Sequence, residues 1–406
     1  MGATVTTIST SPPLHRPSIG ATRGYDTLGP SRQAQGDTVG STTTAQWDVV
    51  VVGASFAGAA CALAARRAGL RVCVLERKRD PGMRLHTTGI IVREAAEGTP
   101  LAAIPAPLVR RIDGVRLYAP GLRSMALQRP DYYFLATDTP GVMRWLAGEL
   151  EGAGVELRLM QSFTDAQRTA DGWRVAGLGG CRWLVGADGA KSRVAMRAGL
   201  GRVRGFLYGV EHEFDGAVLA EPDRLHCFID RRLAPGYIGW AAQNPRGVQL
   251  GLAFRHRDDR AGVPDIAALR ARVGGPLGLE PSLSPTATRA GLIPCSGPVR
   301  PLAAPGVILT GDAAGIVSPV TAGGIHSAWR HGEAVGHAIA RHLLDGGPDP
   351  AQVASRAAPR FRGKRVLRWA FDHLQQDWAF DALLGTPPLR WAAQRIYFHA
   401  RPGGAA

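Results

Sequence analysis

Two glycines five positions apart and an acid eighteen residues further on are the first residues whose spacing suggests chemistry. Gly53 permits a tight turn, and Gly58 lets a following helix pack closely on a strand. The N-terminus of that helix offers free N–H groups and a positive dipole to a pyrophosphate, and Glu76 can accept hydrogen bonds from the ribose hydroxyls of an adenosine. This spacing predicts a dinucleotide site, with Ser55 standing where the usual pattern has a second glycine.

The elements around these residues are those that such a site requires. The run Val49–Val52 is typical of a strand buried on both faces, as in parallel sheets. Small residues over Ala59–Ala68 predict a helix that lies close to a sheet, with Gly69 after its last turn. A second buried strand over Val72–Leu75 ends at the acid, so the segment is interpreted as one βαβ unit.

Two later turns each present an Asp after an apolar run. Asp188-Gly189 follows one strand-like run, and Gly311-Asp312 follows another, over Val307–Leu309. In the second case a buried strand delivers the acid into a Gly/Ala-rich turn, where no bulky side chain blocks a close ligand. A further helix is expected after the consecutive glycines Gly323-Gly324.

Taken in order, these three motifs resemble the flavoprotein superfamily that contains aromatic hydroxylases and geranylgeranyl reductases. The third block looks more like the geranylgeranyl reductase branch, because Gly315 stands where the hydroxylases usually carry a His. The resemblance covers roughly residues 48–345 and implies FAD as the cofactor. No second Gly-rich fingerprint of this quality follows a strand elsewhere, so we expect no separate nicotinamide domain. The flavin would then be reduced by a transiently bound NAD(P)H or by an electron-donor protein.

The resemblance also implies roles for individual residues. Asp312 would bond the ribityl hydroxyls, and Gly323-Gly324 would direct N–H groups at the N1/C2-oxygen edge of the flavin, where a reduced flavin is anionic. Asp188 is expected to shape the turn beneath the cofactor. The residues expected to bind the cofactor are Gly53, Ser55, Phe56, Ala57, Gly58, Glu76, Arg77, Arg84, Asp188, Gly311, Asp312, Gly323, Gly324 and Ile325.

Four residues are candidates for the substrate side of the site. Tyr237 and Trp240 resemble an aromatic strand of the reductase branch that faces the substrate, although aromatic core packing is an alternative interpretation. His86 and His326 lie inside flavin-site motifs and could relay a proton near neutral pH, or could be structural. Many reductases of this branch carry a Cys where this chain has His86. Thr139 stands where relatives often have a flavin-contacting Arg.

The pattern as a whole predicts an α/β fold: a Rossmann-like FAD-binding domain with a parallel sheet, a substrate domain on an antiparallel sheet, and a helical C-terminal region. Alternating apolar residues between about 105 and 135 and between about 200 and 292 predict the antiparallel strands. The expected divisions are a disordered tail (1–46), FAD-binding parts (47–105, 135–200, 296–345), substrate parts (106–134, 201–295) and the helical region (346–406).

The charge balance is strongly basic, with 48 Lys and Arg against 33 Asp and Glu and a formal net charge of +15. Such an excess can indicate nucleic-acid or membrane binding, but the arginines are scattered, so we expect no nucleic-acid partner. The exception is the segment 360–374, where Val366, Trp369, Ala370 and Leu374 fall at helical spacing among bases. This segment is predicted to be a basic amphipathic helix, which either contacts a membrane peripherally or packs its apolar stripe on the domain.

The five cysteines lie far apart, with no C-x-x-C pair and no histidine at metal-ligand spacing. This usage predicts no disulfide framework and no metal site, and it is typical of a reducing compartment, so a cytoplasmic protein is expected. The uncharged stretch Val49–Ala65 is short for a membrane span and is interrupted by glycines, so it is interpreted as strand, turn and helix.

These features favour an FAD-dependent oxidoreductase that saturates a double bond in a hydrophobic small molecule, of which an isoprenoid is one candidate. A single-component monooxygenase is the main alternative. A halogenase is less favoured, because the paired-Trp motif and spaced catalytic Lys of that class are absent. A non-catalytic flavin-binding accessory protein is a third possibility, suggested by the basic C-terminal segment.

Overall fold

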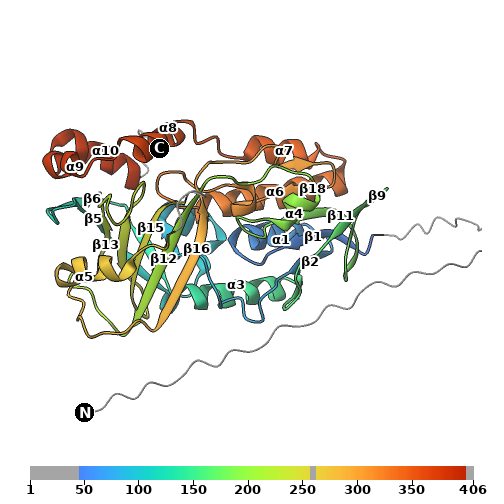
Figure 1. Cartoon of the computed structure of the whole chain (residues 1–406). Coiled ribbons are helices and arrows are strands. Elements are labelled where there is room, and N and C mark those ends of the chain that lie inside the picture. Colours follow the sequence, from blue (N-terminus) through green and yellow to red (C-terminus); the bar gives the residue numbers. More distant parts are fainter. Residues whose placement is uncertain (1–44, 257–261, 399–406) are drawn as a thin grey trace, which may run out of the picture. The chain divides into compact units, whose positions relative to one another are not determined.

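The computed structural model describes residues 45–256 and 262–398, so the predicted N-terminal tail lies outside the described residues except for its last two positions (Figure 1). Four consecutive valines explain the first strand: Val49–Val52 are almost fully buried, because a parallel strand is covered on both faces. Around this strand, β1, the sheet runs in the order β17-β18-β11-β1-β2-β8. The strands are β1 (Trp47–Val52), β2 (Val72–Leu75), β8 (Glu156–Arg158), β11 (Gly179–Gly186), β17 (Ala303–Ala304) and β18 (Val307–Leu309).

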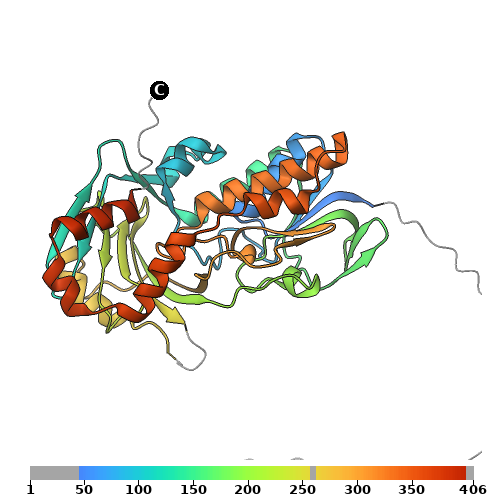
Figure 2. The same cartoon turned by 90° about the horizontal axis from the view of Figure 1, so that it is seen from above.

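Neighbouring strands of this sheet are parallel except for β17, which is antiparallel to β18. Strands β9 and β10, which are joined by a turn at Asp171-Gly172, form a hairpin that pairs with β11. Helices α1 and α6 lie beside the sheet and pack on each other (Figure 2). The hairpin strands and the helices are β9 (Ala166–Thr169), β10 (Gly172–Val175), α1 (Phe56–Arg67), α3 (Thr139–Gly152), α4 (Arg193–Arg197), α6 (Ile325–Asp345) and α7 (Pro350–Ala357).

The second large sheet has seven strands in the order β16-β12-β15-β14-β13-β5-β6. All of its pairs are antiparallel except β13 with β5. Its long central strands β12 and β15 pair over their full lengths. The strands are β5 (Gly114–Tyr118), β6 (Ser124–Gln128), β12 (Phe206–Asp215), β13 (Arg224–Phe228), β14 (Gly239–Gln243), β15 (Gly247–His256) and β16 (Ala287–Pro294).

A three-stranded sheet, β3-β7-β4, and several short helices complete the middle of the chain. Asp265 caps helix α5, whose apolar face covers the seven-stranded sheet. The remaining elements are β3 (Ile90–Val92), β4 (Val109–Ile112), β7 (Phe134–Thr137), α2 (Arg93–Gly98), α5 (Ile266–Leu277) and the 3₁₀ turns η1 (Pro100–Ala103), η2 (Ala106–Leu108) and η3 (Gly311–Ala314).

Three C-terminal helices form a layer over one end of the seven-stranded sheet (Figures 1 and 2). Side chains of these helices bond backbone groups in loops that connect strands of the sheet. Asp381 accepts a hydrogen bond from the Gly121 N–H, and Arg368 donates one to the Gly236 carbonyl. Their bounds are α8 (Arg362–Leu374), α9 (Asp377–Leu383) and α10 (Pro387–Tyr397). With both sheets and these helices in place, the predicted fold class is confirmed.

Three further sequence observations can be compared with the described residues. All five cysteines are buried as free thiols, and no group of three or more metal-ligating side chains occurs in this part of the chain. None of its helices is long and apolar enough to cross a membrane. The uncharged stretch from Val49 is β1, a turn and α1, as predicted.

Candidate flavin and substrate site

A cavity of about 1050 Å³ begins where β1, β11 and β18 end and continues beneath the C-terminal helices. Strand ends that converge at one edge of a parallel sheet are the usual place for a dinucleotide. Thirteen of the fourteen predicted cofactor-binding residues line this cavity; Gly58 alone does not. The three sequence motifs, which are far apart in the chain, are therefore brought together.

The first turn has room only for glycine. Gly53 has a φ of +105°, and a Cβ at this position would lie 2.4 Å from the Ala187 carbonyl oxygen of the neighbouring strand segment. A Cβ on Gly58 would lie 1.9 Å from the Gly53 oxygen, so this residue serves packing, as predicted. Ser55 precedes α1 without using its side chain as a cap, which leaves the N–H groups of that helix end directed toward the cavity.

Glu76 is fixed at the end of β2. Its Oε2 accepts from the Ala54 N–H (3.2 Å) and its Oε1 accepts from the Lys78 N–H (3.0 Å). The side chain is only 7% exposed and borders the cavity. The two donors hold the carboxylate in one orientation, and each oxygen retains a lone pair that can accept from a ligand hydroxyl.

Asp188 is engaged by the protein itself. Its Oδ1 accepts from the Ser192 hydroxyl (2.6 Å), and its Oδ2 accepts from the N–H groups of Arg193 (2.6 Å) and Val194 (3.1 Å). These contacts organise the turn after β11 and the start of α4. The geometry agrees with a residue that shapes the floor of the site.

Asp312 has the opposite environment. Its side chain is exposed to the cavity, within a densely packed part of the protein, and its carboxylate accepts no hydrogen bond within the described residues. Burial raises the pKa of this carboxyl to about 6. A carboxylate that faces the cavity with free acceptor positions can accept hydrogen bonds from the hydroxyls of a ligand bound there.

The residues at this end of the cavity can be matched with the parts of FAD. The glycine turn admits a diphosphate, Glu76 and Asp312 supply acceptors at separate positions, and Gly323 and Gly324 begin α6 at the cavity wall. The donor and acceptor groups therefore match a long ligand that carries a diphosphate between two hydroxyl-bearing chains. The site fits FAD.

One prediction concerns Asp312. Replacing it with Asn should weaken FAD binding by about 2 kcal/mol, roughly thirtyfold, because a charge-assisted acceptor is lost. Because ionisation of the wild-type carboxyl is disfavoured by its surroundings, FAD affinity should also fall as the pH drops below about 6. Fluorescence titration of flavin-free protein with FAD between pH 5 and 8 measures both effects. Asp171→Asn, in an exposed hairpin turn, is the matched control and should bind FAD normally.

The same shift has a consequence for flavin-free protein. A carboxyl whose pKa is raised on folding binds its proton more tightly when folded, so the free energy of unfolding should decrease as the pH rises through about 6. Asp312→Asn should be the more stable protein above that pH and should lack this part of the pH dependence. Thermal unfolding from pH 5 to 8 would contradict the assignment if the two flavin-free proteins lost stability in parallel.

The two predicted histidines have different positions. His86 lines the cavity, and its Nδ1 lies 2.8 Å from the Ala290 carbonyl oxygen. Because a carbonyl only accepts, Nδ1 carries a proton and Nε2 is the nitrogen that can exchange one. His86 also borders a smaller, more polar cavity of about 470 Å³. His326 lies in the first turn of α6 and is not among the residues lining either cavity, so no contact supports a catalytic role for it.

Tyr237 and Trp240 both line the cavity. Tyr237 is almost fully buried, and burial raises the pKa of its phenol, so its hydroxyl stays protonated. The Trp240 indole N–H donates to Glu211 Oε2 (3.0 Å). Both aromatic side chains therefore lie at the cavity, and a buried acid orients Trp240. That they face the substrate stays a prediction.

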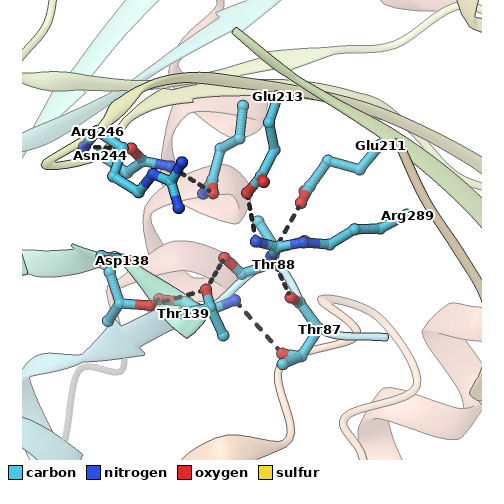
Figure 3. Close-up of polar contacts among 12 residues, drawn as sticks. Thr87, Thr88, Asp138, Thr139, Glu211, Glu213, Asn244, Arg246 and Arg289 are labelled. Carbon is cyan, nitrogen blue, oxygen red and sulfur yellow. Dashed lines mark hydrogen bonds and ion pairs between the residues drawn. The ribbon is translucent and has the colours of Figure 1, made fainter. Parts of the chain in front are cut away.

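That acid belongs to a network of charges beside the cavity (Figure 3). Glu211 and Glu213 lie two residues apart on β12, and Arg289 on the adjacent β16 forms ion pairs with both. Arg289 Nη1 also donates to the Thr87 carbonyl (3.1 Å), and the Thr88 hydroxyl bonds Glu211. Burial raises the pKa of the Glu211 carboxyl, and Arg289 opposes that rise. The network thus joins the 84–89 loop, which passes the cavity, to the seven-stranded sheet.

Thr139, where relatives often have an arginine, points into this loop. Its hydroxyl lies 3.0 Å from the Thr137 hydroxyl and donates to the Thr88 carbonyl (3.2 Å). Thr139 is fully buried and does not line the cavity. Its role in this chain is to support the loop from behind.

The far arm of the cavity is mostly apolar, with Arg368 and Gln375 as the polar residues that the C-terminal helices contribute to its lining. Its walls come from strands of the seven-stranded sheet and from the inner faces of the three C-terminal helices. The residues that line this arm are Leu117, Leu225, Cys227, Ile229, Ile238, Leu367, Ala370, Phe371, Leu374, Phe380, Leu389, Ala392, Ile396 and Tyr397. An arm of this composition suits a hydrocarbon ligand.

Sequence comparisons agree with this geometry. A family model described as an NAD(P)-binding Rossmann-like domain matches residues 51–97, and one described as an FAD binding domain matches residues 179–351. A digeranylgeranylglycerophospholipid reductase 2 of Methanothermobacter thermautotrophicus is 26% identical over 331 residues, which is 79% of this chain and 84% of that protein.

Two solved structures show the same fold. A geranylgeranyl bacteriochlorophyll reductase-like protein from Thermoplasma acidophilum has a TM-score of 0.74 at 18% identity, covering 87% of this chain and 96% of that one. The flavin-dependent brominase Bmp2 has a TM-score of 0.65 at 18% identity, covering 86% and 93%.

The fold and site define an FAD-dependent oxidoreductase. The comparisons support the FAD-dependent, geranylgeranyl-reductase-like flavoprotein superfamily for this chain.

Sequence reasoning missed two parts of the site. The acid Glu211 and its partner Arg289 were not singled out, because 78 residues separate them and nothing local marks the pair. The apolar linings of α9 and α10 were also missed, although the small and apolar residues Leu389, Ala393 and Ile396 recur at helical spacing.

Proposed function

We propose that this protein saturates carbon–carbon double bonds of an isoprenoid-like hydrophobic molecule by using FAD. The observation that carries the proposal is the apolar arm, which is continuous with the predicted flavin site and is walled by the seven-stranded sheet and the C-terminal helices. The similar reductase of Methanothermobacter, whose name specifies a digeranylgeranyl lipid, supports the substrate class. When bound, FAD would supply the hydride equivalent for such a reduction.

The chain's own residues would bind and orient the substrate. The apolar arm would exclude water from the reacting carbons, and Tyr237 and Trp240, which line the same cavity, would hold the substrate in place. His86, with a proton fixed on Nδ1, would exchange one at Nε2 with water or substrate at the junction of the two cavities. The reductant stays a prediction: a transient NAD(P)H or an electron-donor protein.

A monooxygenase is the second candidate, and a halogenase the third. Both candidates are supported by the similarity in fold to a flavin-dependent brominase, because one FAD-binding fold can serve either reduction or oxygen-dependent chemistry. The turn at Gly315 and the mostly apolar lining of the arm favour the reductase.

The deciding experiment compares product masses with and without oxygen. FAD-loaded protein, reduced by dithionite under argon, is incubated with a detergent-solubilised digeranylgeranyl lipid and the products are analysed by mass spectrometry. Gain of two hydrogens per double bond is the expected result. Product that forms only with oxygen and gains one oxygen, or gains bromine when bromide is added, would overturn the reductase assignment.

A matched pair of variants tests the role of the apolar arm in the same assay. Phe371→Glu places a charge in the arm and should reduce turnover at least tenfold while FAD stays bound, because a hydrocarbon cannot solvate that charge. Trp378→Glu changes an exposed side chain on the neighbouring helix and should leave turnover of detergent-solubilised substrate unchanged. Equal turnover by the two variants would remove the arm from the substrate path.

A further inference from the structure

The outer face of the C-terminal helices carries an unusual share of exposed apolar side chains. Trp369, Trp378 and Trp391 are 57%, 73% and 58% exposed, and they are the only exposed tryptophans in the described part of the chain. Val366, Leu374 and Leu383 are exposed on the same helices. Scattered single apolar residues need no explanation, but a group of six on one layer does. These six residues are called the aromatic face below.

The same helices are apolar on their inner side as well. Leu367 and Phe371 of α8 and Leu389 and Ile396 of α10 line the substrate arm. The aromatic face therefore does not exist to pack the helices on the domain, because other residues do that. Leu374 belongs to both sets, since it lines the cavity and is 63% exposed, so the cavity reaches the surface at the aromatic face.

Charge on this layer is divided between the two sides. Its three acids turn toward the protein: Asp372 pairs with Arg368 and Arg255, Asp377 accepts from the Arg231 N–H, and Asp381 accepts from the Gly121 N–H. The exposed arginines of the layer lie on, or directly before, the same helices as the aromatic face. They are Arg360, Arg362, Arg365, Arg390 and Arg395, the last with its guanidinium 4.3 Å from the centre of the Trp391 ring.

This composition identifies the kind of surface that would cover it. Tryptophan prefers the boundary between hydrocarbon and water, and arginines beside it attract anionic headgroups. A second copy of the chain is disfavoured as the occupant, because a symmetric contact would bring arginines against arginines. A lipid surface satisfies the tryptophans and the positive charges together.

We infer that α8, α9 and α10 dock on an anionic lipid surface through the aromatic face, with the exposed arginines at the headgroups. The sequence pointed only to residues 360–374 and left two alternatives there; the inferred surface extends across three helices. If the proposed function holds, a consequence that rests on it is that a hydrocarbon substrate would enter from the lipid near Leu374.

Vesicle flotation tests the docking without any turnover. FAD-loaded protein is mixed with vesicles of phosphatidylcholine alone or with 30% phosphatidylglycerol, and the apparent partition coefficient is measured at low and high salt. We expect at least about tenfold stronger binding to the anionic vesicles, reduced by 0.5 M NaCl. Binding should also quench tryptophan fluorescence when brominated lipids are included. The inference is overturned if the protein binds neither the phosphatidylcholine vesicles nor the vesicles that contain phosphatidylglycerol.

Paired variants assign the binding to this surface. Trp378→Ser with Trp391→Ser should weaken partitioning about tenfold or more, whereas Met196→Ser with Val218→Ser, exposed elsewhere, should not. Arg362→Gln with Arg390→Gln should weaken binding to anionic vesicles about twenty-five-fold, near fivefold for each charge. Arg67→Gln with Arg110→Gln, exposed on α1 and β4, is the control.

Two outcomes separate the occupants and the two proposals. The lipid inference would be overturned if the wild-type protein bound no vesicles but formed concentration-dependent dimers, and the Trp378→Ser, Trp391→Ser double variant did not dimerise. That result would assign the aromatic face to a second copy of the chain. The tryptophan pair should keep full activity on detergent-solubilised substrate. Failure to saturate any double bond would remove the proposed function while leaving the flotation result intact.

Discussion

Gly53→Ala should purify without bound flavin, with FAD affinity reduced by about 4 kcal/mol, roughly a thousandfold. The added Cβ would lie 2.4 Å from the Ala187 oxygen, and real Cβ atoms essentially never approach a neighbour within 3.0 Å. Both atoms belong to backbone, so the turn after β1 and the segment after β11 would have to separate. These two segments border the cavity where the diphosphate is expected, so the separation would distort the cradle itself.

Gly69→Ala is the matched control for this prediction. Gly69 has a nearly identical φ of +96°, but a Cβ there would meet nothing within 4 Å. This variant should lose about 1 to 2 kcal/mol of unfolding free energy from the left-handed backbone alone and should remain yellow. Visible absorbance after gel filtration, together with FAD titration, measures both variants. Normal flavin content in Gly53→Ala would place the diphosphate elsewhere.

The flavin half of the site could be predicted from sequence because each of its determinants is local. A run of four valines, a glycine turn, a helix of small residues and a terminal acid lie within 30 residues. Each is dictated by short-range geometry, and the structure places all four as expected. The later motifs at Asp188 and Asp312 likewise follow buried strands, so parallel pairing was sufficient to bring them to the same edge.

The substrate half was less predictable because its determinants are contacts between distant segments. In α8, helical spacing suggested one apolar stripe with arginines outside. The structure instead buries Arg368, which donates to the Gly236 carbonyl, and exposes Trp369, because the cavity takes Leu367 and Phe371. A single periodic pattern cannot show that a helix has two apolar faces with different partners.

The same limit explains the histidines. His86 and His326 were equivalent in sequence, since both lie in motifs that pass the flavin. In the structure Arg289 bonds the 84–89 loop, which carries His86, to the seven-stranded sheet at the cavity, whereas His326, in the first turn of α6, does not line the cavity. The position of His86 at the cavity thus depends on a charge network between neighbouring strands. No local sequence signal marks that network.

Removing that network is the second large expected effect. Arg289→Met should lower the free energy of unfolding by about 3 to 5 kcal/mol, because it leaves two acids without their cation in a largely buried place. The side chains of Arg289, Glu211 and Glu213 are only 10%, 5% and 12% exposed. The loop should also loosen, since the bond to the Thr87 carbonyl is lost, and turnover should fall with it. Urea unfolding followed by circular dichroism measures the stability change.

The control and the pH dependence separate this mechanism from a simple loss of packing. Arg246→Met breaks an exposed ion pair with Asp215 nearby and should cost less than about 1 kcal/mol. Without Arg289 only the hydrogen bonds from Trp240 and Thr88 oppose the burial that raises the pKa of Glu211. The pKa of Glu211 should therefore rise further, and the folded variant should bind protons more readily than the unfolded chain. Its stability deficit relative to wild type should therefore shrink as the pH falls from 8 to 5. A deficit that is constant across this range would mean that Arg289 acts through its volume and not through its charge.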